Sequence, residues 1–209
     1  MKTENKIDFI IDTLDSLFPM PRIPLKHKDP YTLLISVVLS SQTTDKQVNK
    51  VTKSLFEKAS TPQEMVKLSR EEIYEMIKSC GLAPTKSRNI LKLSRALLDE
   101  FNGEVPDKLE ALESLPGVGH KSASVVLSQA FGKPAFPVDT HIHRLANRWK
   151  LSDGSSVKQT EKDLKELFPR SLWTKLHLQM IYFGREYCPA RGHDPKSCPI
   201  CNVVNPNQE

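Results

Sequence analysis

The chain has 209 residues and carries 30 Lys and Arg residues against 25 Asp and Glu residues, a formal net charge of +5. This length can bury a full hydrophobic core in one domain or two small ones, so no disulfide framework is needed for folding. The basic excess suits a polyanionic partner. Acidic residues interrupt the apolar positions of the N-terminus, which therefore does not resemble a secretory signal, and no apolar run is long enough to cross a bilayer. We expect a soluble, intracellular protein.

The first half of the chain is predicted to form helices that are separated by turn residues. Apolar residues recur at helical spacing over 6–18, and prolines at 19, 21 and 24 then mark a candidate linker. Asp29 and Pro30 provide an N-cap and a first-turn proline for a helix over 31–41, and a new helix starts at Asp45. Gln42 is therefore predicted to lie exposed at a junction between two helices.

A second junction follows 40 residues later. Ser69 and Glu72 form a capping-box pattern for a helix that is expected to end at Gly81, and a proline at position 84 opens the next helix, which runs to Gly103. Leu82 is the residue between these two helices, so we expect it to be a junction residue as well.

The remainder of the chain is also predicted to be helical. Helices are expected from Pro106 to a turn at 115–121, over 121–131, from Asp139, over 156–168 and over 172–187. No segment alternates apolar and polar residues with a period of two, so the fold class is all-α, with roughly ten helices.

Two short segments contain the candidate functional residues. Residues 115–121 read Leu-Pro-Gly-Val-Gly-His-Lys, and Gly117 and Gly119 allow a tight turn that directs backbone N–H groups outward at a helix N-terminus, which is an anion site. Taken alone, Lys121 is a phosphate contact or, when its amine is neutral, a nucleophile. Asp139 lies 18 residues further on, and taken alone it is an N-cap that stabilises a helix by roughly 1 kcal/mol.

Together, Leu-Pro-Gly-Val-Gly-x-Lys over 115–121 and Val-Asp-Thr-His-Ile-x-Arg over 138–144 resemble the endonuclease III family of helix-hairpin-helix DNA glycosylases. Segments 39–45, 81–82 and 102–106 also resemble the family. The resemblance implies the helix-hairpin-helix DNA glycosylase fold, with two domains. A six-helix domain would span 23–133, and residues 1–22 and 134–209 would form a second helical domain that contains a cysteine loop at 188–201.

The resemblance implies a bifunctional DNA glycosylase and AP lyase of base excision repair. It would act as a monomer on double-stranded DNA, remove oxidised or damaged pyrimidines and cleave 3′ to the abasic site by β-elimination; in a bacterium it would be cytoplasmic and nucleoid-associated. Lys121 would attack the sugar and form a Schiff base, while Asp139 would stabilise positive charge. Gln42 and Leu82 would fill the gap left by the flipped base, and Gly117 and Gly119 would hold the DNA backbone.

Lys121 must be neutral to attack, yet an unperturbed lysine is only about one part in a thousand neutral near physiological pH. We therefore expect burial and the helix N-terminus to lower the pKa of Lys121. Two alternatives remain: a non-catalytic helix-hairpin-helix DNA-binding protein and a monofunctional glycosylase. Adenine glycosylases of the superfamily lack this lysine and carry a catalytic glutamate before the junction glutamine, whereas residues 31–41 contain no acidic residue.

The C-terminal cysteines depart from the family pattern. Relatives hold a 4Fe-4S cluster on four cysteines with gaps of six, two and five residues, but Cys188, Cys198 and Cys201 are separated by nine and two residues, and Asn207 stands at the fourth position. His193 lies within the lengthened gap. Three cysteines with either His193 or an exogenous ligand could hold an iron-sulfur cluster, and the three cysteines with His193 could bind a tetrahedral zinc ion. An empty loop of free thiols is the third alternative.

Overall fold

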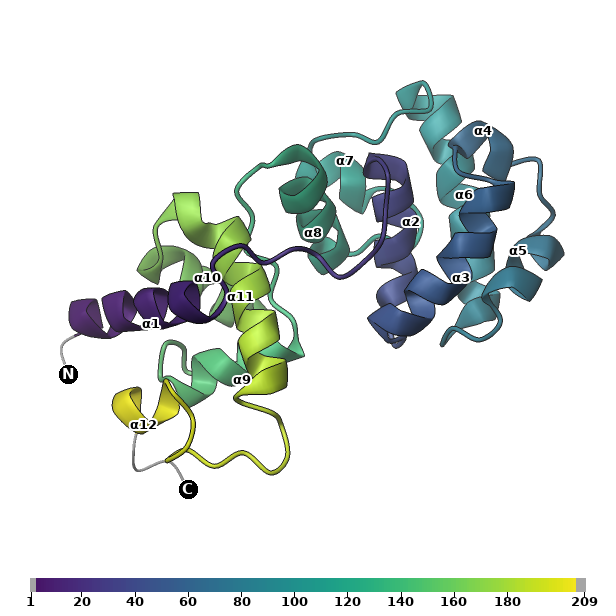
Figure 1. Cartoon of the computed structure of the whole chain (residues 1–209). Helices are drawn as coiled ribbons and strands as arrows, with labels where there is room; N and C mark the ends of the chain where they lie inside the picture. Colours follow the sequence, from purple (N-terminus) through teal and green to yellow (C-terminus); the bar gives the residue numbers. More distant parts are fainter. Residues whose placement is uncertain (1–2, 206–209) are drawn as a thin grey trace. The chain divides into compact units, whose positions relative to one another are not determined.

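The computed structural model describes residues 3–205, and this part of the chain is helical without any β-strand (Figure 1), which confirms the all-α prediction. The described residues form two compact units. Residues 23–132 are called here the hairpin unit, and residues 3–22 together with 133–205 are called the terminal unit. None of the described helices combines the length and the apolarity that crossing a membrane requires.

The hairpin unit is built around the apolar helix α2, whose residues 31–39 are all buried. Helix α2 packs against α3, α6 and α8, and α6 packs against α4 and α5. The helices of this unit are α2 (Pro30–Ser40), α3 (Asp45–Lys58), α4 (Pro62–Met65), α5 (Arg70–Ile77), α6 (Ala83–Phe101), α7 (Leu109–Glu113) and α8 (His120–Phe131).

Several helices of the hairpin unit start and stop where local sequence signals place them. The Asp29 carboxylate accepts a hydrogen bond from the backbone of Thr32 at 2.8 Å and completes a capping box with it, while Pro30 opens α2. Ser69 forms the predicted capping box with Glu72. Helix α8 ends at Gly132, which has a φ of 63° in the left-handed region that glycine adopts without strain.

Two predicted boundaries are wrong. Helix α5 ends at Ile77 rather than at Gly81, because the Cys80 amide bonds back to the Ile77 carbonyl at 2.8 Å and the chain then turns through a left-handed residue. Helix α7 begins at Leu109 rather than at Pro106, since Lys108 keeps an extended backbone with φ −121°. Proline fixes only its own φ near −65°, which suits a turn as well as the first turn of a helix.

The terminal unit is organised around helix α11. This helix packs against α1 and α9, and α10 packs against α9. The core includes Trp149 and Phe183, whose rings meet edge to face at 5.4 Å, and the predicted apolar stripe of the first helix is buried at Ile7, Ile10 and Leu14. The elements of this unit are α1 (Thr3–Leu17), α9 (Thr140–Arg148), α10 (Val157–Leu167), the 3-10 helix η1 (Arg170–Leu172), α11 (Trp173–Glu186) and α12 (Cys201–Val204).

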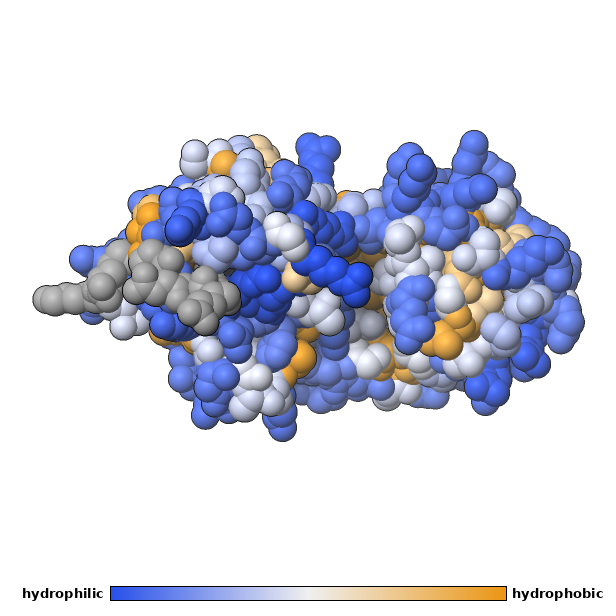
Figure 2. All heavy atoms as spheres, turned by 90° about the horizontal axis from the view of Figure 1, so that it is seen from below, coloured by the Kyte–Doolittle hydropathy of each residue, from blue (hydrophilic) through white to orange (hydrophobic). Residues whose placement is uncertain are grey.

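The face of the molecule shown in Figure 2 is mainly polar. On the face shown in Figure 2 the apolar residues form small, scattered patches among hydrophilic ones. Among the described residues, large apolar side chains that are exposed occur singly, and one of them is the junction residue Leu82. Isolated apolar residues on a surface are ordinary, so the position of Leu82 in the fold has to decide whether it has a function.

Candidate functional site

The glycine-containing turn joins α7 to α8 in the hairpin unit. Leu115 and Val118 are buried and anchor the turn, and the Val118 amide donates to the Leu115 carbonyl at 3.1 Å. Gly117 has a φ of 82°, and a Cβ at this position would lie 2.6 Å from the Asn89 Nδ2 atom. Glycine at position 117 is therefore required both by the backbone conformation and by the close approach of α6.

Gly119 plays a different part in the same turn. It is the N-cap of α8 with a φ of −90°, and a Cβ here would meet no atom of the protein within 4 Å. Because glycine has no side chain, it also caps none of the first-turn amides of α8. Folding does not require a glycine at 119, whereas a ligand that approaches the helix N-terminus closely would, and the positive end of the helix dipole favours an anion there.

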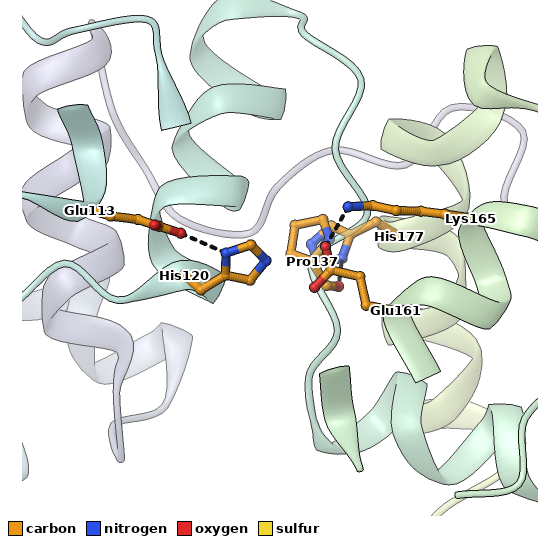
Figure 3. Close-up of polar contacts among 6 residues, drawn as sticks. All are labelled: Glu113, His120, Pro137, Glu161, Lys165 and His177. Carbon is orange, nitrogen blue, oxygen red and sulfur yellow. Dashed lines mark hydrogen bonds and ion pairs between the residues drawn. The ribbon is translucent and has the colours of Figure 1, made fainter. Parts of the chain in front are cut away.

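Lys121 is the second residue of α8, directly behind the turn. His120 precedes it, and the His120 Nδ1 atom lies 2.6 Å from Glu113 Oε1 at the end of α7 (Figure 3). This contact connects the last residue of α7 to the first residue of α8. The helix N-terminal position of Lys121 agrees with the sequence, but its side chain is exposed rather than buried. The protein therefore does not remove this amine from water in the way that the sequence analysis expected.

The two junction residues lie in neighbouring loops of the hairpin unit. Gln42 has a φ of 50° and Leu82 a φ of 58°, a conformation that costs a non-glycine residue roughly 1–2 kcal/mol. The loops touch, because a Cβ on Gly81 would lie only 2.5 Å from the Gln42 carbonyl oxygen. Gln42 is exposed, and Leu82 is 51% exposed. Strained residues that cluster on an exposed surface are typical of functional sites.

A buried lysine that the sequence analysis did not identify supports the Gln42 loop. Lys86 of α6 is only 4% exposed, and its ammonium donates hydrogen bonds to the Leu39 carbonyl at 2.8 Å, to the Ser41 carbonyl, and to the Thr43 hydroxyl at 3.0 Å. Burial lowers the pKa of Lys86. The available signal was its spacing, since Lys86 falls on the buried face of α6 with Ala83, Ile90, Leu93 and Leu97.

Asp139 is the N-cap of α9 in the terminal unit, as its position before a helix predicts. Its Oδ1 atom accepts a hydrogen bond from the Ile142 amide at 2.9 Å, and its side chain is half-buried. The preceding segment is fixed by His177 of α11, whose Nδ1 atom donates to the Pro137 carbonyl at 2.8 Å (Figure 3). This buried histidine was also missed, because only the folded chain brings residues 137 and 177 together.

Helix α9 is held in place by a second set of contacts to α11. The Arg144 guanidinium donates to His141 Nδ1 at 3.1 Å, to the Gly184 carbonyl at 2.9 Å and to the Cys188 carbonyl at 3.1 Å. Burial lowers the pKa of His141, which keeps the imidazole neutral and able to accept this bond. The orientation of Asp139 at the start of α9 therefore depends on the segment that follows α11.

That segment is the cysteine loop. Cys188, His193, Cys198 and Cys201 place one ligand atom each within 4.8 Å of one another, and the three cysteines are buried. These four side chains can hold a metal. Asn207, which stands at the family's fourth cysteine position, lies outside the described residues.

The predicted residues thus fall in both units. The hairpin unit contributes Gln42, Leu82, Gly117, Gly119 and Lys121, and within it the loops of Gln42 and Leu82 are in contact. The terminal unit contributes Asp139 and the cysteine loop, which Arg144 connects.

Known proteins are similar to this chain in both sequence and fold. Residues 35–170 match the HhH-GPD superfamily base excision DNA repair protein family. Endonuclease III of Bacillus subtilis (strain 168) is 39% identical over 209 residues, covering 98% of this chain and 94% of the relative.

Two solved structures are similar over nearly the whole chain. A non-covalent endonuclease III–DNA complex matches with a TM-score of 0.93 and 44% identity, covering 98% of this chain and 96% of the other. A trapped covalent endonuclease III–DNA intermediate, an estranged-adenine complex, matches with a TM-score of 0.91 and 45% identity, covering 96% and 94%. The chain belongs to the HhH-GPD superfamily of base excision DNA repair proteins and, within it, to the endonuclease III family of DNA glycosylases and AP lyases.

Proposed function

We propose that this chain removes oxidised or ring-damaged pyrimidines from double-stranded DNA and then cleaves the strand 3′ to the abasic site, with Lys121 as the nucleophile. The observation that carries the proposal is the position of Lys121, one residue inside α8 and directly behind the Gly117–Gly119 turn. A similar endonuclease III has been trapped in a covalent intermediate with DNA, which supports covalent chemistry here. In a bacterial cell the enzyme would act in the cytoplasm, at the nucleoid.

Lys121 would act as an amine nucleophile. Its neutral Nζ atom attacks the anomeric carbon of the sugar, the bond from this carbon to the base breaks, and the base leaves with the bonding electrons and takes up a proton. The sugar ring then opens, and Lys121 is joined to it as a protonated Schiff base. Removal of a proton from the 2′ carbon breaks the bond from the 3′ carbon to its oxygen, so the strand is cut by β-elimination and water finally releases Lys121.

Asp139 would serve the same reaction as a carboxylate. Positive charge develops on the sugar as the base departs, and a carboxylate fixed beforehand stabilises that charge without reorganising. The hydrogen bond from the Ile142 amide to Oδ1 fixes this carboxylate, and the Pro137 contact with His177 fixes the backbone before it. The cap and the catalytic role are compatible, because the cap uses Oδ1 and the carboxylate has a second oxygen.

Gln42 and Leu82 would act on the duplex. A base inside the stack is beyond the reach of any nucleophile, so the damaged nucleotide has to be flipped out at a cost of a few kcal/mol. The exposed, apolar Leu82 can fill the space that the flipped base leaves, and the amide of Gln42 in the adjoining loop can form hydrogen bonds with the unpaired partner base.

The proposal is tested with a labelled duplex that contains one oxidised pyrimidine, alongside a duplex of the same sequence with an oxidised guanine. We expect a nick at the pyrimidine lesion without added alkali and much less product from the purine lesion. Release of the base without a nick would show a monofunctional glycosylase. Binding to the lesion with neither step would show a non-catalytic DNA-binding protein.

A further inference from the structure

The cysteine loop does not fit the cluster that the family usually holds. Each protein ligand of a 4Fe-4S cluster binds a different iron, so the four ligand atoms surround the whole cluster and stand far apart. Here the four ligand atoms all lie within 4.8 Å of one another, and the Sγ atoms of Cys188 and Cys201 are 3.9 Å apart. One tetrahedral zinc ion, with Zn–S bonds of about 2.3 Å and Zn–N bonds of about 2.0 Å, separates its ligand atoms by roughly 3.5–3.8 Å.

The fourth ligand is a histidine whose ring nitrogen lacks a partner. The Nε2 atom of His193 is buried and has no nitrogen or oxygen atom as a hydrogen-bond partner within residues 3–205, while the histidine ring lies near the Cys198 thiol. A buried polar atom without a partner costs free energy, and a metal ion that accepts its lone pair would remove this cost. The four residues are separated by four, four and two residues. His193 therefore lies inside the gap between Cys188 and Cys198, which is longer than the corresponding gap in the family.

The surroundings of the sulfurs also suit a metal. The Cys201 amide donates to the Cys198 Sγ atom at 3.5 Å, and the Arg148 guanidinium donates to the Cys188 Sγ atom at 3.1 Å. Three thiolates and a neutral imidazole around a divalent ion carry one net negative charge, which the charge of Arg148 balances. Contacts of this kind orient metal ligands and stabilise the loaded site.

We propose that Cys188, His193, Cys198 and Cys201 bind a single zinc ion in place of an iron-sulfur cluster. The four protein ligands complete a tetrahedral shell, so the site is structural and leaves no open position for substrate. The ion joins the end of α11 to α12, and the Cys188 carbonyl joins this loop to Arg144 and Arg148 of α9. The zinc site therefore stabilises the terminal unit around α9, the helix that Asp139 caps.

The direct test is elemental analysis of the full-length protein, purified both anaerobically and in air. We expect about one zinc per chain, no stoichiometric iron and no visible absorption from a cluster. Iron at several atoms per chain would overturn the proposal, and so would a folded protein without stoichiometric metal.

Variants identify the ligands. Cys198→Ser and His193→Ala should lose most of the zinc and show a lower thermal midpoint, whereas His193→Cys should keep the zinc because it supplies a fourth thiolate. Cys80→Ser is the matched control, since Cys80 is equally buried but lies in the hairpin unit, and it should keep full zinc content. Full zinc content in His193→Ala would show that the histidine is not a ligand and contradict the proposed set. These readouts are independent of the chemistry proposed for Lys121.

Discussion

Among single residues, Asp139 has a structural role as the N-cap of α9 and a proposed chemical role, and one substitution can separate the two. Asparagine caps a helix about as well as aspartate, so Asp139→Asn should keep the bond to Ile142 and change the free energy of unfolding by less than about 0.5 kcal/mol. Removal of the negative charge should slow base removal by about 100-fold or more, with little change in DNA affinity. Single-turnover kinetics and a binding titration measure both effects.

The matched control for this prediction is Asp29→Asn. Asp29 caps α2 through the same kind of bond, from the backbone amide three residues on to its Oδ1 atom, but belongs to no predicted site, so its asparagine variant should keep both stability and activity. An Asp139→Asn enzyme with the turnover of the wild type would show that this carboxylate is only a cap.

Leu82 combines a left-handed backbone with an exposed apolar side chain, and we propose that this side chain enters the DNA duplex. In Leu82→Gly the left-handed backbone is relaxed, but the greater freedom of glycine in the unfolded state offsets the gain, so unfolding should change by less than about 1 kcal/mol. Excision from duplex DNA should nevertheless fall by roughly tenfold or more, because nothing fills the gap beside the flipped base.

Thermal unfolding and excision assays compare this variant with Met20→Gly, which removes another exposed apolar side chain outside the helices. The Met20 variant should keep its activity. Equal activity of Leu82→Gly and wild type would rule out insertion of Leu82 into DNA.

Among the elements, the hairpin turn contains one glycine that the fold requires, Gly117, and one glycine that we propose lies against a phosphate, Gly119. Gly119→Ala should change the free energy of unfolding by less than about 1 kcal/mol, because its Cβ meets nothing within 4 Å and the weaker N-cap is offset by the lower freedom of alanine in the unfolded state. It should nevertheless bind DNA about tenfold more weakly, because the methyl group blocks a phosphate. Gly117→Ala should instead lower the thermal midpoint, since φ is 82° and Asn89 is in the way. Wild-type DNA affinity in Gly119→Ala would exclude phosphate binding at this turn.

Lys86 connects α6 to the end of α2 and to the loop of Gln42. Lys86→Met keeps much of the apolar length but leaves the Leu39 and Ser41 carbonyls and the Thr43 hydroxyl without this donor, so we expect a loss of about 2–4 kcal/mol in unfolding free energy. Hydrogen exchange should be faster over residues 39–44. Lys92→Met, an exposed lysine of the same helix, is the control and should change neither quantity.

At the scale of the whole molecule, local signals predicted most helix boundaries because the deciding atoms lie within four residues of one another. The cap at Asp29 and the capping box at Ser69 are of this kind. The turn that follows the early end of α5 was missed because it also depends on a distant contact: the Gly81 amide donates to the Thr43 hydroxyl, 38 positions away, at 3.1 Å. The positive φ angles of Gln42 and Leu82 were missed for the same reason.

The residues of the candidate site also divide into those that local sequence signals identify and those that only contacts in the folded chain reveal. Lys121 and Asp139 were identified because each lies in a short, continuous motif whose pattern resembles a family. The supporting residues, Lys86 at the Gln42 loop and His177 at the segment before Asp139, act through hydrogen bonds across 40 or more positions, which no local pattern contains. The closeness of His193 to the three cysteines likewise had to come from the folded loop.

Borohydride trapping is the decisive test of the Schiff base that we propose between Lys121 and the sugar. Wild-type protein mixed with abasic-site duplex and borohydride should yield a covalent protein–DNA adduct, and peptide mapping should locate the DNA on Lys121. Lys121→Gln should give no adduct, while Lys162→Gln, which removes an exposed lysine of α10, should give the wild-type amount. An adduct that persists in Lys121→Gln, or a wild-type protein that gives no adduct, would show that Lys121 does not form the Schiff base.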